Sequence, residues 1–132
     1  MTMRDINNAI KVVTTIEPAA SITATTTGAA VDTAGYRSAC AVIHSGVHTD
    51  GTFTPTLEES DASGSGYTTV AAGDLSGSFT AVIASNDQSI QKVGYLGSKR
   101  YLRVVMTETV ASAGAFFTAV IVLGDPISAP AA

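Results

Sequence analysis

The stretch from Lys99 to Leu123, KRYLRVVMTETVASAGAFFTAVIVL, decides the fold class. Its first part, Lys99–Thr109, alternates apolar with polar side chains, as expected for a β-strand with one buried face. Gly114 interrupts the pattern, and the segment Ala115–Leu123 that follows is a nearly continuous apolar run. Such a run is typical of a central strand that is covered on both faces. The stretch therefore predicts two strands of a β-rich protein.

Short strand-like segments separated by turn-forming residues extend outward from this stretch. They are Asn8–Ile16, Ala30–Asp32, Ser38–Val47, Phe53–Ser60, Tyr67–Val70 and Ser89–Tyr95. Many short strands at such spacing are typical of a sandwich or barrel. The chain of 132 residues suits one domain. We therefore predict an all-β, single-domain β-sandwich over residues 1–132, jelly-roll-like, with extended terminal arms at residues 1–8 and 127–132.

One connection carries a specific turn signal. Asp50-Gly51 lies between two of the predicted strands, and this dipeptide favours a type I′ turn, which needs positive φ at both central residues. The sequence therefore predicts that Ser38–Val47 and Phe53–Ser60 pair as an antiparallel hairpin. Pro55 predicts that the second strand has an unpaired side or a bulge, because proline cannot donate to a ladder.

Composition and charge exclude several classes. The net charge of −4 argues against nucleic-acid binding, and charged residues make up only 14% of the chain. With Cys40 as the one cysteine, no internal disulfide is possible. No apolar stretch has the length of a membrane span, and the first residues lack the pattern of a secretory signal. We expect a protein made in a cytoplasm, without membrane or nucleic-acid partners.

Candidate catalytic or metal-binding groups are few. His44 and His48 have even spacing, which places them on one strand face but about 13 Å apart, too far for one metal ion. Glu58 and Glu59 should face opposite ways, and Asp61 is left as either a solvated strand end or a Ca²⁺ ligand. We expect no catalytic residues, no metal and no cofactor, and hence no enzyme.

The one basic patch is formed by Lys99, Arg100 and Arg103, close to Tyr101. Two interpretations remain open for it: a solvated strand end, or an electrostatic contact with an acidic protein partner. In a regular strand, Arg100 should point away from Arg103.

Five segments carry a resemblance to a known family: Met3–Val13, Gly28–Tyr36, Thr49–Thr52, Leu57–Asp61 and Val93–Val104. They resemble the small β-rich virion proteins of tailed bacteriophages. The resemblance covers about residues 3 to 125 and implies a capsid decoration, or cement, protein on the capsid exterior. It further implies that the protein is made in the cytoplasm of a bacterial host, binds the major capsid protein, and forms a homodimer or trimer.

Partner-binding residues are expected in the arms and at the basic strand end. They are Met3, Arg4, Asp5, Lys99, Arg100, Arg103, Ile127 and Pro130. Two other functions remain open: a structural protein of the head–tail junction or tail, and a carbohydrate-binding β-sandwich. The lack of tryptophan counts against sugar binding, although four tyrosines could stack on a sugar ring.

Overall fold

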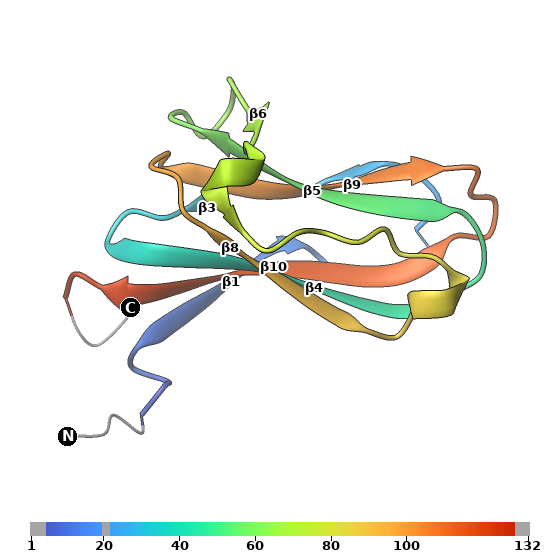
Figure 1. Ribbon diagram of the computed structural model, residues 1–132, viewed down its shortest axis with the longest axis horizontal. Helices are drawn as coiled ribbons and strands as arrows, with labels where there is room; N and C mark the ends of the chain where they lie inside the picture. The colour runs from blue at the N-terminus through green and yellow to red at the C-terminus, as the bar shows by residue number, and fades with distance from the viewer. Residues whose placement is uncertain (1–4, 20–21, 129–132) are drawn as a thin grey trace.

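The computed structural model describes residues 5–19 and 22–128, which fold into two antiparallel sheets packed face to face (Figure 1). The first sheet contains β1 (Ile10–Ile16), β10 (Ala115–Pro126), β4 (Tyr36–His48), β8 (Ile90–Tyr95) and β7 (Leu75–Ser76), in that order. The second contains β2 (Thr26–Thr27), β9 (Tyr101–Thr109), β5 (Thr52–Ser60) and β6 (Thr68–Thr69), and β3 (Val31–Asp32) also pairs with β9. The predicted all-β sandwich is therefore confirmed.

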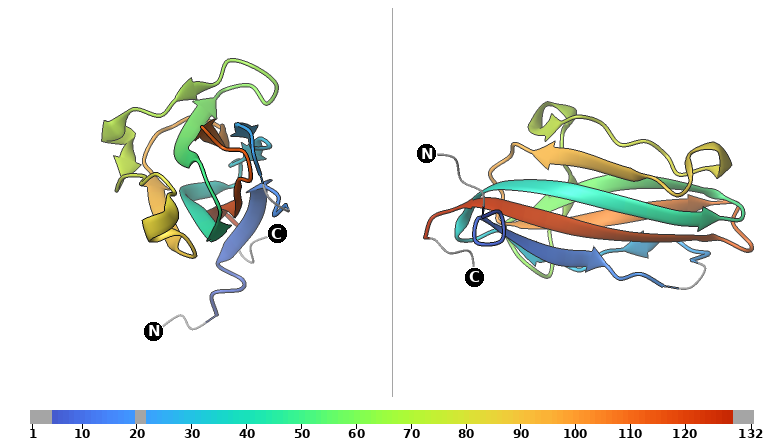
Figure 2. Two further views of the ribbon diagram at one scale, coloured as in Figure 1. Left: turned by 90° about the vertical axis from the view of Figure 1, so that its right-hand side faces the viewer. Right: turned by 90° about the horizontal axis from the view of Figure 1, so that it is seen from below.

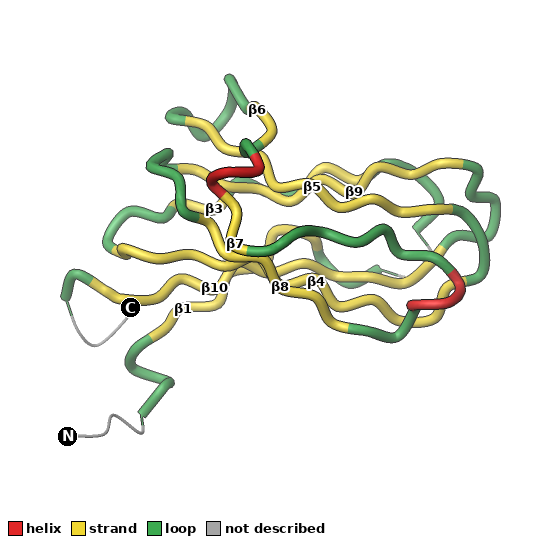
Figure 3. The backbone as a smooth tube through the Cα atoms, viewed as in Figure 1, coloured by secondary structure: helices red, strands yellow, loops and turns green. Residues whose placement is uncertain are grey.

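The chain passes repeatedly from one sheet to the other. It runs from β1 to β2 and β3, back to β4, across to β5 and β6, back to β7 and β8, across to β9, and back to β10. This is the wrapping order of a jelly roll. The connection from β6 to β8 also carries two short 3₁₀ helices, Ala72–Asp74 and Ala84–Asn86 (Figure 3).

The core lies between the sheets and follows the alternation in the sequence. From β9, the side chains of Leu102, Val104 and Met106 are fully buried. They face the buried residues of β10 and β4 in one apolar cluster. Phe53 of the second sheet meets Phe117 of the first, with ring centroids 5.2 Å apart.

The predicted hairpin is wrong. β4 lies between β10 and β8, so neither of its edges is free for β5, which pairs instead with β9. Gly51 has the expected positive φ of 85°, but Asp50 is not among the described residues with positive φ, so the turn is not type I′. The connection is a corner that carries the chain from the first sheet to the second.

The Asp50 carboxylate holds this corner in place. It accepts hydrogen bonds from the backbone N–H groups of Ser112, Ala113 and Gly114, at 2.7–3.2 Å, and from the Ser112 hydroxyl at 2.8 Å. These donors, with the Gly114 N–H first, lower the pKa of Asp50 from its ordinary 3.8 to about 2. Asp50 therefore clamps the β4–β5 corner to the β9–β10 connection.

The expectation that His44 and His48 share a strand face is also wrong. The register between β4 and β10 shifts between Ala115 and Phe117, where Gly46 and Val47 of β4 lie opposite Phe116 of β10. This β-bulge reverses the inward–outward alternation. His44 consequently faces outward and is exposed, whereas the His48 ring lies edge-on to the buried Phe53 ring.

β10 is a central strand, as predicted, but it is not covered on both faces. Its inward side chains are buried, whereas the outward side chains remain accessible, and Phe116 is 41% exposed. The second sheet covers one face of β10, and no other described segment lies over the middle of the opposite face (Figure 2).

Candidate interaction surfaces

Among the described members of the predicted partner-binding set, Asp5, Lys99, Arg100 and Ile127 lie at one end of the sandwich, whereas Arg103 lies within β9, opposite Glu58 of β5. The Ile127 N–H donates to the Gly35 carbonyl at 2.9 Å, and the Thr33 N–H donates to the Arg100 carbonyl at 2.9 Å. The β3–β4 turn thus joins the chain after β10 to the loop before β9. We call this end, with residues 5–9, 33–35, 96–100 and 126–128, the terminal end; it is at the left in Figure 1. Met3, Arg4 and Pro130 lie outside the described residues.

Apolar side chains are exposed on the terminal end. Ile6, Leu96 and Ile127 are 68%, 65% and 63% exposed. Residues 5–9 form a turn rather than a fully extended arm: the Ala9 N–H donates to the Ile6 carbonyl at 3.0 Å, and the Asp5 carboxylate accepts from the Asn8 N–H. These exposed apolar side chains are available for burial against a partner.

The basic residues near this end are paired with carboxylates within the chain. Lys99 Nζ lies 2.7 Å from Asp61 Oδ2. Arg100 makes a two-pronged contact with Asp32, with both N–O distances 2.9 Å. The hydrogen bond from Arg100 lowers the pKa of Asp32, and Asp61 raises the pKa of Lys99.

Arg103 has the most enclosed of these pairs. Its Nε donates to Glu58 Oε1 at 2.7 Å across the β5–β9 ladder, and its guanidinium lies 3.9 Å from the centroid of the Tyr67 ring. The two side chains are 27% and 20% exposed. The basic patch is therefore compensated locally. Sequence reasoning missed this because the carboxylates are 38 to 68 residues distant along the chain.

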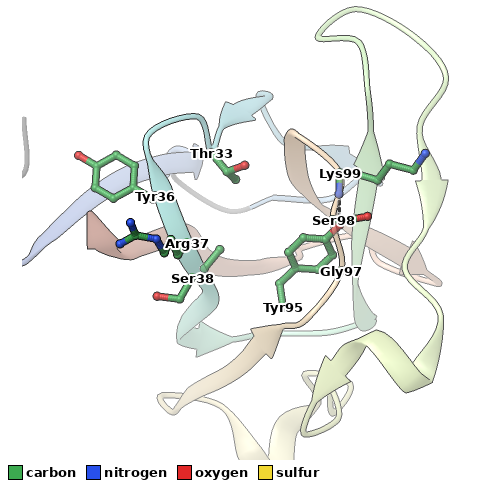
Figure 4. A pocket seen from close by; sticks show the side chains of 9 residues that line it. Thr33, Tyr36, Arg37, Ser38, Tyr95, Gly97, Ser98 and Lys99 are labelled. Atoms are coloured by element: carbon green, nitrogen blue, oxygen red, sulfur yellow. Dashed lines mark hydrogen bonds between the residues drawn. The ribbon is translucent and has the colours of Figure 1, made fainter. Parts of the chain in front are cut away.

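A polar hollow of about 230 Å³ opens at the same end, between the start of β4 and the β8–β9 loop (Figure 4). The Tyr95 side chain lines it; its hydroxyl donates to Glu59 Oε2 at 2.5 Å and accepts from the Lys99 N–H at 2.9 Å. Burial and the contact with Glu59 raise the pKa of Tyr95 to about 12. The Lys99 ammonium points away from the hollow (Figure 4). Arg37, which also lines the hollow, forms an ion pair with Asp125 at 3.6 Å.

The tyrosines that sugar binding would use make contacts within the chain. Tyr95 is only 8% exposed. The Arg103 guanidinium covers one face of Tyr67, and the Arg100 guanidinium lies 5.1 Å from the centroid of the Tyr101 ring. A sugar ring would have to displace these cations or use the opposite ring faces.

A second surface, which sequence reasoning did not identify, is the outer side of the first sheet. Its register aligns outward residues of four neighbouring strands, and we call this surface the valine face. It is formed by Ile10, Val12 and Thr14 of β1, Thr118, Val120 and Val122 of β10, Cys40, Val42 and His44 of β4, and Ile90 and Lys92 of β8. The apolar run of β10 was the signal in the sequence for this surface. It predicted that both faces of the strand are covered, whereas the structure leaves the outer face accessible.

The described residues offer no group of three or more His, Cys, Asp and Glu side chains that could hold a metal ion. Within the same residues, no helix is long and apolar enough to cross a membrane. No protein-family model matches the sequence, and no curated protein matches it.

Proposed function

We propose that the protein is a non-enzymatic structural protein of a tailed-phage virion, a capsid decoration protein that binds the major capsid protein shell and stabilises it by interface burial. The terminal end is the surface that contacts the shell. The resemblance of its sequence segments to small phage virion proteins supplies the biological context.

One observation carries the proposal. Arg100 and Ile127 are far apart in the sequence, yet the backbone hydrogen bonds of the β3–β4 turn hold them at the same end of the jelly roll. Asp5, which precedes β1, lies at this end as well. A contact surface needs such convergence, because a stable interface buries roughly 800 Å² on each partner.

The charge arrangement favours apolar and hydrogen-bonded contacts over long-range attraction. Lys99 and Arg100 are already paired, so an acidic partner would have to compete with Asp61 and Asp32. The exposed Ile6, Leu96 and Ile127 side chains are available for burial. Binding should therefore depend only weakly on salt.

Co-sedimentation with expanded capsids of the source phage tests the proposal. The wild-type protein should bind saturably at a simple ratio to the major capsid protein, and Ile127→Asp should weaken this binding. Val110→Asp is the matched control, because Val110 is 89% exposed and lies at the opposite end of the sandwich. The absence of wild-type binding, or equal binding by both variants, would contradict the proposal.

Calibrated mass spectrometry of purified particles separates a shell protein from a tail protein. A decoration protein should be present at about one copy per capsid subunit, or a simple fraction of it. A ratio of a few per cent would place the protein at the head–tail junction or in the tail. Absence from particles would leave sugar binding as the next hypothesis to test.

A further inference from the structure

The valine face is unusual for an accessible sheet surface because its members are almost entirely uncharged. Val12 and Ile90 are 56% and 65% exposed, and Cys40, Val42, Val120 and Val122 are only partly covered. Among the described residues that form this face, Lys92 is the only one with a formal charge at neutral pH. Figure 2, right, looks directly onto it.

We propose that the valine face is a homodimer interface, on which a second copy of this chain packs sheet against sheet. The contact is isologous, so the same patch serves both copies. Val42 and Val120, which pair directly across β4 and β10, lie at its centre. This inference is independent of the proposed capsid contact, which uses the terminal end.

The outer side of the first sheet is large enough for a small dimer contact. Four strands spaced about 4.8 Å apart are roughly 19 Å wide, and the outward positions of β10 extend this side beyond the valine face, from Phe116 to Gly124, roughly 27 Å. Because β1 and β8 are shorter than β10, the product of roughly 500 Å² per copy, or roughly 1,000 Å² in total, is an upper bound, and it is near the lower limit for a specific interface. We therefore expect a reversible dimer whose population depends on concentration.

The charge distribution selects a second copy as the occupant. A charged partner surface would lose hydration on this face without gaining an ion pair, except at Lys92. A second valine face brings apolar groups of the same kind and size. Lys92 lies on β8, at the margin, where its ammonium can remain in solvent. The net charge of −4 is carried elsewhere, so the two faces do not repel strongly.

Sedimentation velocity of the full chain, from about 1 to about 200 µM, tests this inference. The wild type should shift from monomer to dimer over this range, and Val120→Lys should remain monomeric. Val105→Lys is the matched control: Val105 is a half-buried valine at the centre of the opposite sheet's outer face. It should dimerise as the wild type does.

A second pair of variants covers the case in which Val120→Lys fails to fold. Val12→Lys lies at the exposed edge of the face and should weaken the dimer at least tenfold, whereas Val110→Lys, 89% exposed and away from the face, should not. A wild type that is monomeric throughout, or a Val12→Lys variant that dimerises normally, would overturn the inference. If a monomeric wild type bound capsids, the dimer inference would be wrong but the proposed function would still be supported.

Cys40 provides an independent readout, because it lies on the valine face directly opposite Val122. Its alkylation by iodoacetamide should slow as the wild-type concentration rises, since the dimer covers the thiol. In Val12→Lys, whose dimer should be at least tenfold weaker, the rate should depend less on concentration. A concentration-independent rate in the wild type would contradict this interface even if a dimer formed by another surface.

Discussion

The two outer faces of the sandwich differ in chemistry, although both consist of outward side chains on antiparallel strands. The first sheet presents the valine face. The second presents what we call the threonine face: Thr27 of β2, Thr52, Thr54, Thr56 and Glu58 of β5, and Arg103, Val105, Thr107 and Thr109 of β9. On this second face, Thr54 lies opposite Thr107 and Glu58 forms an ion pair with Arg103. Hydroxyl groups and paired charges can remain hydrated, whereas covering exposed valines lowers the free energy of the system.

The contrast shows that fold and surface chemistry are separable in this chain. Inward positions of both sheets carry the same kind of residue, since both contribute to one core. Outward positions are not constrained by that core, so their composition can differ between the two sheets. Both faces are rich in β-branched residues, which suit strands whether or not they carry a hydroxyl.

The largest expected effect comes from the core that supports both faces. Phe53→Ala removes the ring that meets Phe117 between the sheets and should lower the free energy of unfolding by about 3–5 kcal/mol. Thr54→Ala, the next residue on the same strand, faces solvent and should change it by less than about 0.5 kcal/mol. Urea denaturation measures both. Equal losses would show that the assignment of inner and outer faces on β5 is wrong.

The corner that connects the two sheets should give a pH-dependent effect. The pKa of Asp50 is lowered in the folded protein, so its contribution to stability is complete above about pH 4 and is lost as the pH falls toward 2. Asp50→Asn should lower the urea midpoint at pH 6, because a neutral amide is a weaker acceptor for the three N–H groups.

Urea midpoints of the wild type and Asp50→Asn at several pH values complete this test. The difference between the two proteins should shrink between pH 4 and pH 2. A constant difference over this range would show that the carboxylate charge does not hold the corner.

Local patterns predicted most strands and the alternation along β9, where Leu102, Val104 and Met106 are buried. Period-two alternation depends on the next few residues only, so it can be read from one segment. The identity of the neighbouring strand depends on the whole topology. The Asp50-Gly51 signal therefore gave the correct bend but the wrong partner for β5, and nothing local distinguishes a hairpin from a corner between sheets.

The surfaces were harder to predict for the same reason. The bulge that reverses His48 is visible only when β4 is paired with β10. The carboxylates that neutralise Arg100 and Arg103 come from β3 and β5, and no spacing rule links them. The valine face exists because short outward patterns of four separate strands come into register, although each pattern alone is unremarkable.

A smaller effect is expected from the ion pair on the threonine face. A double-mutant cycle with Arg103→Met and Glu58→Gln should give a coupling of about 1 kcal/mol, because the pair is half-buried and faces Tyr67. Arg100 and Asp32 are more exposed, and their coupling should be smaller and more sensitive to salt. Urea denaturation measures both coupling energies. A larger coupling energy for Arg100 and Asp32 would contradict this ranking.

The smallest effect on stability should accompany a change in assembly, and it tests the comparison most directly. Val120→Thr gives the valine face the chemistry of the threonine face, and Thr107→Val does the converse on the second sheet. Valine and threonine are both β-branched and both suit a β-strand. The free energy of unfolding of the monomer should therefore change by about 0.5 kcal/mol or less. Sedimentation should nevertheless show a weaker dimer for Val120→Thr. The dimer of Thr107→Val should be unchanged, because one valine among threonines does not make a continuous apolar patch. Equal dimerisation by both variants would mean that the difference in chemistry between the two faces has no role in assembly.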